Sequence, residues 1–491
     1  MTEWDLGALG IDELERLAVL ISLYSTVGDL VLLEGDLGAG KSTFARAMIR
    51  ALCGNSGEDV PSPTFSLVQS YETARGNVHH FDLYRLSGAR DVREIGFEEA
   101  LSTGLTLVEW PDRAKDLLPL ERLSVHLGDA PEPEHRLVRL SGTGAWARRL
   151  DHLRLVHDFI KQQCWGTANI AHVAGDASRR SYARLALGRR TCLLMDSPPL
   201  SNAAAIGDGK PYWELAKSAR EVGTFVQIQA DLRGYGLSVP TILAGNIPAG
   251  LLLVEDFGDH SFADAITDGV PMRSLYRAAT DVLVDISRHD APARLASYDA
   301  SVLLIEARLL IDWYWPHVNG TAAPAGIAED FDRVWSQALA PIATHPRKWV
   351  LRDFHSPNLF WLAQREGLNR IGLIDFQDAL AGHEAYDLAA LLQDARIAVP
   401  AQTETDLLDY YCGQRSARDV SFDDTEFRRS YALLGAQRAT KIMGIFVRLA
   451  KRDGKPAYLT HLSRIKRYLA RNLNNSNLAG LHDWYARNLD F

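Results

Sequence analysis

The stretch LRDFHSPNLF, residues 351–360, places an aspartate, Asp353, five residues before an asparagine, Asn358. Seventeen residues later, the run GLIDFQD brings Asp375 to the end of a short apolar segment. A carboxylate can accept the proton of an attacking hydroxyl, while an amide and a second carboxylate hold a divalent cation beside phosphates. The spacing therefore predicts that Asp353 is the general base and that Asn358 and Asp375 are metal ligands. The alternative is a chance D-x₄-N beside a strand.

The segments before this stretch follow the order of a protein-kinase-like fold with two lobes. LLLVEDFGD, residues 251–259, indicates a buried strand that runs into a hinge, and Glu255 in it is a candidate for contact with the nucleotide. GDASRRSYARL, residues 175–185, lies between two strand-like runs, where a loop over the phosphates belongs. Ser178 in this loop is a second candidate for nucleotide binding.

The strand after that loop departs from the kinase pattern. TCLLMDSPP, residues 191–199, has Met195 near the place where kinases carry a lysine for the phosphates. Arg180 or Arg184 is therefore expected to supply the positive charge, unless both are ordinary surface arginines.

These motifs resemble the aminoglycoside phosphotransferase superfamily, and more narrowly its AmgK family. The resemblance covers about residues 155–491 and includes GDASRRSYARL, LLMDSPP, LLVEDFGD, DWYWP, RDFHSPNLFWL and GLIDFQDALAGHEAYDLAALLQDAR. It implies a two-lobed α+β fold, ATP and Mg²⁺, and phosphorylation of N-acetylmuramic acid and N-acetylglucosamine at the anomeric hydroxyl in peptidoglycan recycling. The family also lacks the kinase lysine, so that departure favours the narrower assignment.

The amino sugar is expected against the C-terminal helical part. Gln437, Arg438 and Lys441 fall on one side of a helix at i, i+1 and i+4, where they could bind hydroxyls or the carboxylate of muramic acid. The alternative is a solvent-exposed helix face. Other small alcohols or aminoglycosides are rival substrates, but the strongly basic segment 425–491 argues against polycationic ones.

An unrelated nucleotide motif lies far upstream. GDLGAGKS, residues 35–42, fits the phosphate-loop template and follows an apolar strand-like run. Gly35, Gly38 and Gly40 let backbone N–H groups turn toward phosphate oxygens at a helix N-terminus. Lys41 is expected to reach the β- and γ-phosphates, and Ser42 to bind Mg²⁺. The alternative is an ordinary Gly-rich turn.

Nucleotide hydrolysis also needs an acid to hold the metal and to position water. Asp82 in HHFDLYR and Glu109 in LVEWP each end a strand-like run, where such an acid is usual. Thr64 in VPSPTF lies between two Pro-rich turns, in a loop that could sense the γ-phosphate. Each could instead be an ordinary strand-end or turn residue.

GDLGAGKSTF, VPSPTF, HFDLYR and VEWPDR, in this order, resemble the TsaE family over about residues 1–150. The resemblance implies an ATPase of tRNA threonylcarbamoyladenosine synthesis that acts on the subunits TsaD and TsaB. It assigns nucleotide and Mg²⁺ binding to Lys41 and Ser42, and hydrolysis to Thr64, Asp82 and Glu109. The acidic first 150 residues are poorly suited to bind nucleic acid directly, so tRNA would be held by the partner subunits.

The chain of 491 residues is long enough for two or three domains. Alternating strands and helices predict an α/β P-loop domain in 1–150, and a kinase-like α+β domain in 151–491 with lobes 151–257 and 258–491. Four separated cysteines, the lack of a signal peptide and the lack of a membrane-length apolar run favour a cytoplasmic protein. A nucleotide-gated scaffold is the non-enzymatic alternative.

Overall fold

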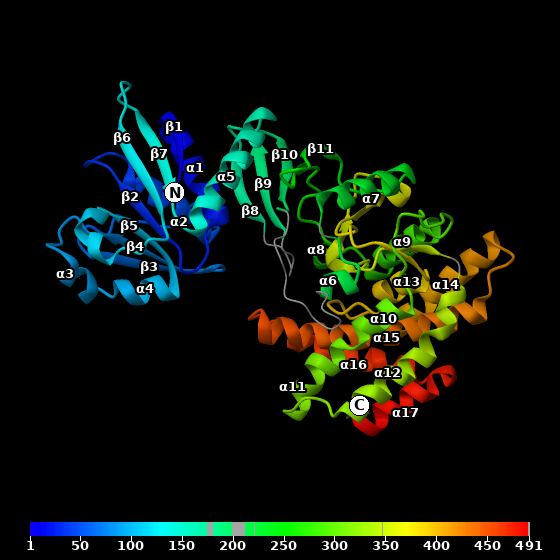
Figure 1. Cartoon of the computed structure of the whole chain (residues 1–491). Coiled ribbons are helices and arrows are strands. Elements are labelled where there is room, and N and C mark those ends of the chain that lie inside the picture. Colours follow the sequence, from blue (N-terminus) through cyan, green and yellow to red (C-terminus); the bar gives the residue numbers. More distant parts are fainter. Residues whose placement is uncertain (174–179, 199–211, 220, 346, 490–491) are drawn as a thin grey trace. The chain divides into compact units, whose positions relative to one another are not determined.

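The computed structural model describes residues 1–173, 180–198, 212–219, 221–345 and 347–489. By its contacts the chain divides into two compact units (Figure 1). The first unit comprises Met1–Pro198 and Ile242–Asp256, and the second comprises Pro199–Thr241 and Phe257–Phe491.

A seven-stranded sheet with the order β1-β7-β6-β2-β5-β4-β3 forms the N-terminal part of the first unit. Its centre is parallel, with β2 between β5 and β6 and with β4 beside β5, whereas the outer pairs are antiparallel. The strands are β1 (Thr2–Gly10), β2 (Leu30–Glu34), β3 (Val68–Thr73), β4 (Gly76–Asp82), β5 (Gly104–Glu109), β6 (Leu123–Asp129) and β7 (His135–Gly142).

Helices cover both faces of this sheet because its central strands are apolar on both sides. Val31 and Leu33 of β2 pack with α1 (Ile11–Tyr24) and α2 (Lys41–Cys53). Leu30 and Leu32 face the opposite way, toward α3 (Ala89–Glu94) and α4 (Phe97–Thr103). Buried parallel strands of this kind are the α/β arrangement that the sequence predicts.

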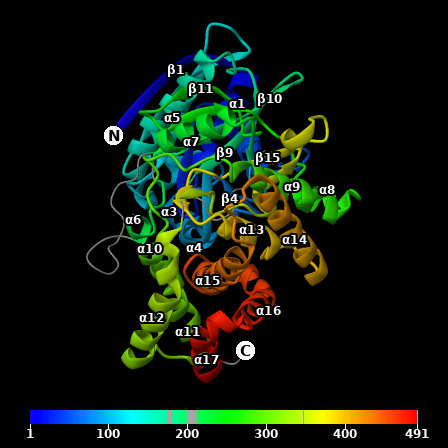
Figure 2. The same ribbon diagram turned by 90° about the vertical axis from the view of Figure 1, so that its right-hand side faces the viewer.

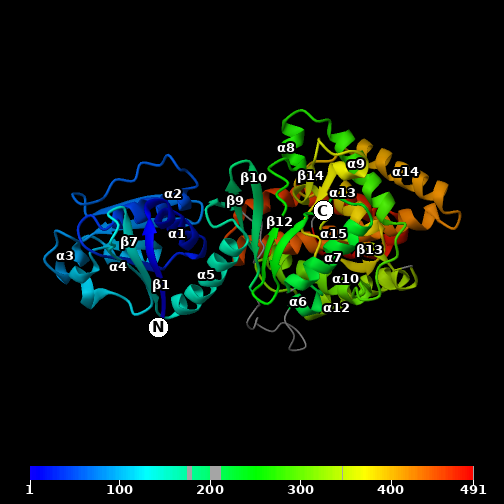
Figure 3. The same ribbon diagram turned by 90° about the horizontal axis from the view of Figure 1, so that it is seen from above.

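A second, antiparallel sheet completes the first unit, with the order β11-β12-β10-β9-β8. Figure 3 shows β9, β10 and β12 side by side. The strands are β8 (Asn169–Val173), β9 (Ser181–Leu187), β10 (Arg190–Asp196), β11 (Ile242–Asn246) and β12 (Leu251–Val254). They supply the strands that sequence analysis assigns to the first kinase lobe.

Helix α5 (Ala145–Gln162) joins the two sheets of the first unit. It packs on β1 and β7, and its buried residues belong to one apolar core that continues into β9, β10 and β12. Tyr24 at the end of α1 donates a hydrogen bond to Asp196 of β10 at 2.5 Å, and His152 of α5 contacts the same carboxylate at 2.8 Å. Residue 150, the expected domain boundary, lies inside this helix.

The second unit is mainly helical. Two small sheets, β13 (Lys348–Val350) with β16 (Leu380–Gly382) and β14 (Leu359–Trp361) with β15 (Ile371–Leu373), frame the RDFHSPN segment. Among the described residues, its α-helices are α6 (Tyr212–Leu215), α7 (Val222–Gly234), α8 (Phe262–Thr267), α9 (Met272–Ile286), α10 (Ala300–Ala307), α11 (Trp315–Asn319), α12 (Ala325–Leu339), α13 (Ala385–Leu392), α14 (Ala401–Arg418), α15 (Asp424–Arg452), α16 (Leu462–Leu473) and α17 (Ala479–Asn488).

The long helix α15 forms the centre of this unit and contacts α10, α13 and α16 (Figure 2). At Gly444 the helix approaches the backbone of Leu309 so closely that a Cβ atom would lie 2.2 Å from the carbonyl oxygen of that residue. Among the described residues, no helix is long and apolar enough to cross a bilayer.

Candidate active sites

The phosphate loop connects β2 to α2 at the carboxyl edge of the first sheet. Gly35 has φ 146°, and a Cβ atom there would lie 2.3 Å from the carbonyl oxygen of Leu127. Gly38 and Gly40 also have positive φ, at 82° and 101°. Such backbone conformations strain other residues, and they turn the loop toward the N-terminus of α2, as an anion-binding loop requires.

Lys41 lies against this loop. Its Nζ donates hydrogen bonds to the carbonyl oxygens of Gly35 at 2.8 Å and Asp36 at 2.7 Å, and lies 3.8 Å from the ring centre of Trp110. Burial lowers the pKa of Lys41, while the carboxylates of Glu109 and Asp82 act in the opposite direction. Trp110 belongs to the VEWP motif, and the sequence predicts no role for it.

The predicted acids end two adjacent parallel strands and lie directly opposite each other in register. Ser42 Oγ donates to Glu109 Oε2 at 3.0 Å, and Thr64 Oγ1 donates to Asp82 Oδ2 at 2.8 Å. Both carboxylates are buried. Ser62 Oγ lies 3.5 Å from both Ser42 Oγ and Asp82 Oδ2 and so links the two pairs. The structure therefore gathers the predicted residues from separate parts of the sequence into one polar cluster: Lys41, Ser42, Thr64, Asp82 and Glu109.

This cluster fits a nucleotide with a divalent cation. At Gly35 the loop approaches the backbone of Leu127 so closely that no side chain would fit there. A cavity of about 540 Å³ borders Gly35, Asp36 and Trp110 on the side of β6 and β7, and none of the five cluster residues lines it. Hydroxyl and carboxylate oxygens, which Ser42 and Glu109 supply, are the ligands that Mg²⁺ prefers.

In the second unit the RDFHSPN segment forms a loop between β13 and β14. The carbonyl oxygen of Asp353 accepts hydrogen bonds from Asn358 Nδ2 at 3.0 Å and from the backbone N–H of His355 at 3.0 Å. Asp375 has φ 56°, and its Oδ1 accepts from Gln377 Nε2 at 2.7 Å. Asp353, Asn358 and Asp375 line one small cavity, so the structure brings the three predicted residues together.

Buried charged side chains anchor the backbone of this loop to the core of the second unit. Arg352, at φ 68°, forms an ion pair with Glu306 of α10, which also accepts from Tyr298 and lies 2.9 Å from Lys441 Nζ. Burial alone would raise the pKa of Glu306, but Lys441 and Arg352 lower it to about 2. Sequence analysis missed Glu306, for which the only signal is one acid in the apolar run ASVLLIEA.

Asp387 of α13 supports the same loop. Its carboxylate accepts the backbone N–H groups of Leu351 at 2.5 Å and Arg352 at 2.9 Å. Burial raises the pKa of Asp387 to about 7, although these two hydrogen bonds act to lower it. Asp387 therefore holds the backbone just before Asp353.

The predicted sugar ligands lie inside the second unit. Gln437, Arg438 and Lys441 are all buried, so the alternative of a solvent-exposed helix face is wrong. Gln437 donates to the carbonyl oxygen of Leu303 at 2.8 Å, and Lys441 pairs with Glu306. Those two side chains are engaged by the protein itself, and a role in sugar binding stays a prediction.

The candidates for nucleotide contact in and beside the second sheet have different surroundings. Arg184 of β9 makes two hydrogen bonds to Asp256, from Nε to Oδ2 at 2.7 Å and from NH2 to Oδ1 at 3.1 Å. Met195 is fully buried in β10. Glu255 directly follows β12, and Ser178 lies outside the described residues.

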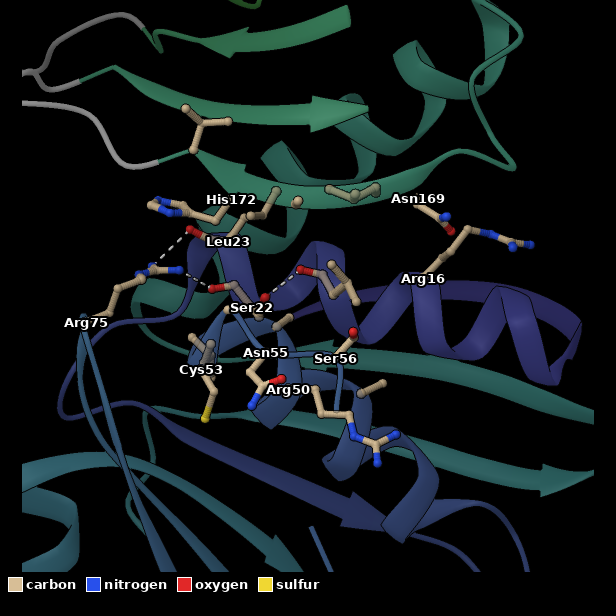
Figure 4. A pocket seen from close by; sticks show the side chains of 18 of the residues that line it. Arg16, Ser22, Leu23, Arg50, Cys53, Asn55, Ser56, Arg75, Asn169 and His172 are labelled. Carbon is tan, nitrogen blue, oxygen red and sulfur yellow. Dashed lines mark hydrogen bonds between the residues drawn. The ribbon is translucent and has the colours of Figure 1, made fainter. Parts of the chain in front are cut away.

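A further cavity of about 1130 Å³ lies in the first unit between α1, the end of α2 and β8 (Figure 4). Arg180 lines it, as do Arg50, Arg75 and His172. Arg75 donates to the carbonyl oxygens of Ser22, Leu23 and Ser25, the groups that a helix end leaves unpaired. Its guanidinium therefore caps α1.

Two family models match the chain. The model described as "Threonylcarbamoyl adenosine biosynthesis protein TsaE" matches residues 10–137, and the model described as "Phosphotransferase enzyme family" matches residues 169–422. Both resemblances in the sequence, and the fold class expected from them, are thereby confirmed.

Individual relatives agree with these matches. The chain is 34% identical over 349 residues to the N-acetylmuramate/N-acetylglucosamine kinase of Caulobacter vibrioides, an alignment that covers 67% of this chain and 94% of that protein. It is 43% identical over 116 residues to TsaE of Rickettsia felis and 42% identical over 115 residues to TsaE of Rickettsia prowazekii. These alignments cover 24% and 23% of this chain, and 67% and 79% of those proteins. The chain is a phosphotransferase that belongs to the phosphotransferase enzyme family, and its N-terminal part belongs to the TsaE family, so that it is a fusion of the two.

Proposed function

We propose that the C-terminal part transfers phosphate from ATP to the anomeric hydroxyl of N-acetylmuramic acid or N-acetylglucosamine in peptidoglycan recycling. We further propose that the N-terminal part hydrolyses ATP in support of tRNA threonylcarbamoyladenosine synthesis. The functional division lies near residue 150, between segments 1–150 and 151–491, and the protein acts in the cytoplasm. The names of the aligned relatives support both activities.

The observation that carries the kinase proposal is the common cavity of Asp353, Asn358 and Asp375. Asp353 accepts the proton as the anomeric oxygen attacks the γ-phosphorus, and the bond between that phosphorus and the ADP oxygen breaks. Asn358 and Asp375 would hold Mg²⁺, which when bound offsets negative charge on the phosphates. The anchored backbone around Arg352 keeps Asp353 in place for this step.

The ATPase proposal rests on the cluster at the ends of β4 and β5. Lys41 supplies positive charge to the β- and γ-phosphates, and the phosphate-loop glycines supply backbone N–H groups. Ser42 and Glu109 would hold Mg²⁺. Asp82 and Thr64 orient the attacking water, because their hydrogen bond places a carboxylate and a hydroxyl side by side. Proteins of the TsaD and TsaB type are the partners, and tRNA is bound through them.

The remaining contacts to ligands are assigned by position. We propose that Arg180 or Arg184, together with Glu255, contacts the nucleotide of the kinase. Arg438 is the more available of the sugar candidates, because Gln437 and Lys441 already have the protein partners described above.

The test is to incubate the full-length chain with ATP, Mg²⁺ and a panel of amino sugars, and to identify the product by ³¹P and ¹H NMR. The account predicts a sugar 1-phosphate from at least one of the two N-acetyl sugars, formed about a hundredfold more slowly with Asp353→Asn at matched protein concentration. Phosphorylation of an aminoglycoside or a simple alcohol instead would replace the proposed substrate. ATP binding without any phosphorylated product would favour a nucleotide-gated scaffold.

A further inference from the structure

Two neighbouring histidines of β4 point to opposite sides of the first sheet. His79 is half-buried, and its ring contacts Ser70 Oγ at 2.8 Å and Thr103 Oγ1 at 3.2 Å. His80 is only 1% exposed and faces the polar cluster at the strand ends. Because side chains alternate along a strand, the two histidines share a backbone but have different surroundings. His79 is therefore a matched reference for His80.

His80 Nε2 lies 3.0 Å from Glu109 Oε1, and both side chains are almost fully buried. The other oxygen of this carboxylate, Oε2, accepts from Ser42 Oγ at 3.0 Å. Each oxygen of Glu109 therefore has its own partner: one is a ring fixed in the sheet, and the other is the hydroxyl at the start of α2. A carboxylate oxygen can only accept, so His80 carries a proton on Nε2.

The contact with His80 restricts the last side-chain torsion of Glu109. The last torsion of a glutamate side chain has a broad distribution, so its carboxylate can rotate with little cost. His80 cannot move with it, because the ring is buried and its backbone is part of the parallel ladder. The Nδ1 atom of His80 is buried and has no hydrogen-bond partner among the described residues. The ring's polar contact in the described structure is thus directed at Glu109.

We propose that His80 is a positioning residue of the N-terminal ATPase, which holds the Glu109 carboxylate so that Oε2 stays directed at Ser42. This inference rests on the proposed ATPase function and extends it to a residue beyond the nucleotide contacts. The contact resembles the outer shell of a metal site, where a hydrogen bond orients a ligand that it does not replace. Loss of His80 should weaken the part of nucleotide affinity that depends on Mg²⁺.

The experiment compares full-length chains carrying His80→Leu, His80→Gln or His79→Leu with the unaltered protein. Binding of a fluorescent ADP analogue is titrated with Mg²⁺ and with EDTA. The signal that disappears in Lys41→Ala is assigned to the N-terminal site, because the C-terminal part also binds nucleotide. Sugar phosphorylation by the same preparations reports whether the chain is folded.

For His80→Leu we expect the Mg²⁺-dependent gain in affinity to fall by about tenfold or more, the usual scale for outer-shell partners, with affinity in EDTA unchanged. His80→Gln retains an N–H donor and should recover most of the gain, and His79→Leu should retain all of it. Equal losses with and without Mg²⁺, or an effect of His79→Leu as large as that of His80→Leu, would overturn the inference. An unaltered protein with no Lys41-dependent signal would instead refute the proposed ATPase, and the inference with it.

Discussion

The two proposed nucleotide sites of this chain hold their acidic residues in different ways. In the N-terminal site the carboxylates of Asp82 and Glu109 stand at the ends of adjacent parallel strands, and they accept from the side chains of Thr64 and Ser42, with one backbone N–H, that of Tyr84, donating to Asp82. In the C-terminal site Asp353 lies on a loop whose backbone is held by hydrogen bonds and by buried charges behind it. Strand register positions the first pair of acids, whereas the second site depends on how the loop is attached to the core.

This difference determines where each site is sensitive to substitution. Arg352 and Asp375 both have positive φ, a conformation that costs free energy in residues other than glycine. Such strain persists only where surrounding contacts impose it. Trp110, which follows Glu109 in the N-terminal site, also has positive φ, so such strain is common to both sites. The C-terminal site should still respond to the residues of other elements that anchor its loop, and the N-terminal site mainly to its own cluster.

The largest expected effect follows from removing the shared buried carboxylate. Glu306→Gln leaves Arg352 and Lys441 as buried cations without their common partner, so we expect the second unit to lose about 3–5 kcal/mol of stability. Urea unfolding of the variant and of Glu329→Gln, an exposed control on α12, measures the difference. Similar stability of the two variants would show that the charges behind the loop do not hold it.

The pH dependence of unfolding gives a second test of Glu306. Its pKa in the folded chain is about 2, below the ordinary value of 4.5. A depressed pKa means that the ionised form stabilises the fold above pH 4.5, and that this contribution disappears as the pH falls toward 2. Glu306→Gln should lack this part of the acid-induced loss. An unchanged acid profile in the variant would contradict the assigned ion pairs.

The next largest effect is on chemistry. Asp353→Asn preserves size but removes the base, so kcat should fall by about a hundredfold or more with little change in KM for ATP. An anomeric hydroxyl is more acidic than an ordinary alcohol, so the loss could lie at the lower end of that range. Steady-state rates on both N-acetyl sugars measure it. Near-normal turnover would remove Asp353 from the role of base.

Asp375→Asn separates metal binding from proton transfer. The substitution weakens a proposed Mg²⁺ ligand, so the lost rate of Asp375→Asn should partly recover at high Mg²⁺. The lost rate of Asp353→Asn should not recover. Rates measured across a series of Mg²⁺ concentrations distinguish the two. Identical Mg²⁺ responses in both variants would contradict the assignment of different roles to Asp375 and Asp353.

The smallest expected effect concerns the contact between the two sheets of the first unit. Tyr24→Phe removes the hydrogen bond to the buried Asp196 carboxylate, which still keeps His152, and should cost about 1–2 kcal/mol. Tyr71→Phe is the matched control, because the Tyr71 hydroxyl is buried without a hydrogen-bond partner among the described residues. Thermal unfolding compares them, and equal shifts would contradict a role for the Tyr24 contact.

Sequence analysis predicted the parts of both sites that depend on local patterns. The spacing in RDFHSPN and GDLGAGKS identified residues that the structure brings together, because each motif forms one loop. It could not identify Glu306 or the anchoring of Arg352, since their contacts join α10, α15 and a loop far apart in sequence. His80 lies two residues before Asp82, so alternation along the strand places both on one face, but no pattern marks its contact with Glu109 or the contact of Trp110 with Lys41.

The domain organisation shows the same limit. The composition near residue 150 indicates a boundary, because loops and edge strands there are polar and rich in glycine and proline. The structure continues one apolar core through α5 into the second sheet, and the position of the functional division stays a prediction. Whether a helix ends a domain or joins two sheets depends on what packs on its second face, which the helical spacing of its own residues does not specify.

The measurement that tests the fusion most directly assays both activities in two single variants, Lys41→Ala and Asp353→Asn. The account predicts that Lys41→Ala abolishes ATP hydrolysis stimulated by TsaD and TsaB type partners and leaves sugar phosphorylation intact. It predicts the reverse for Asp353→Asn, because each residue acts only on the phosphates of its own site. If either substitution lowered both activities equally, the chain would not contain two separate nucleotide sites, and the central claim would fail.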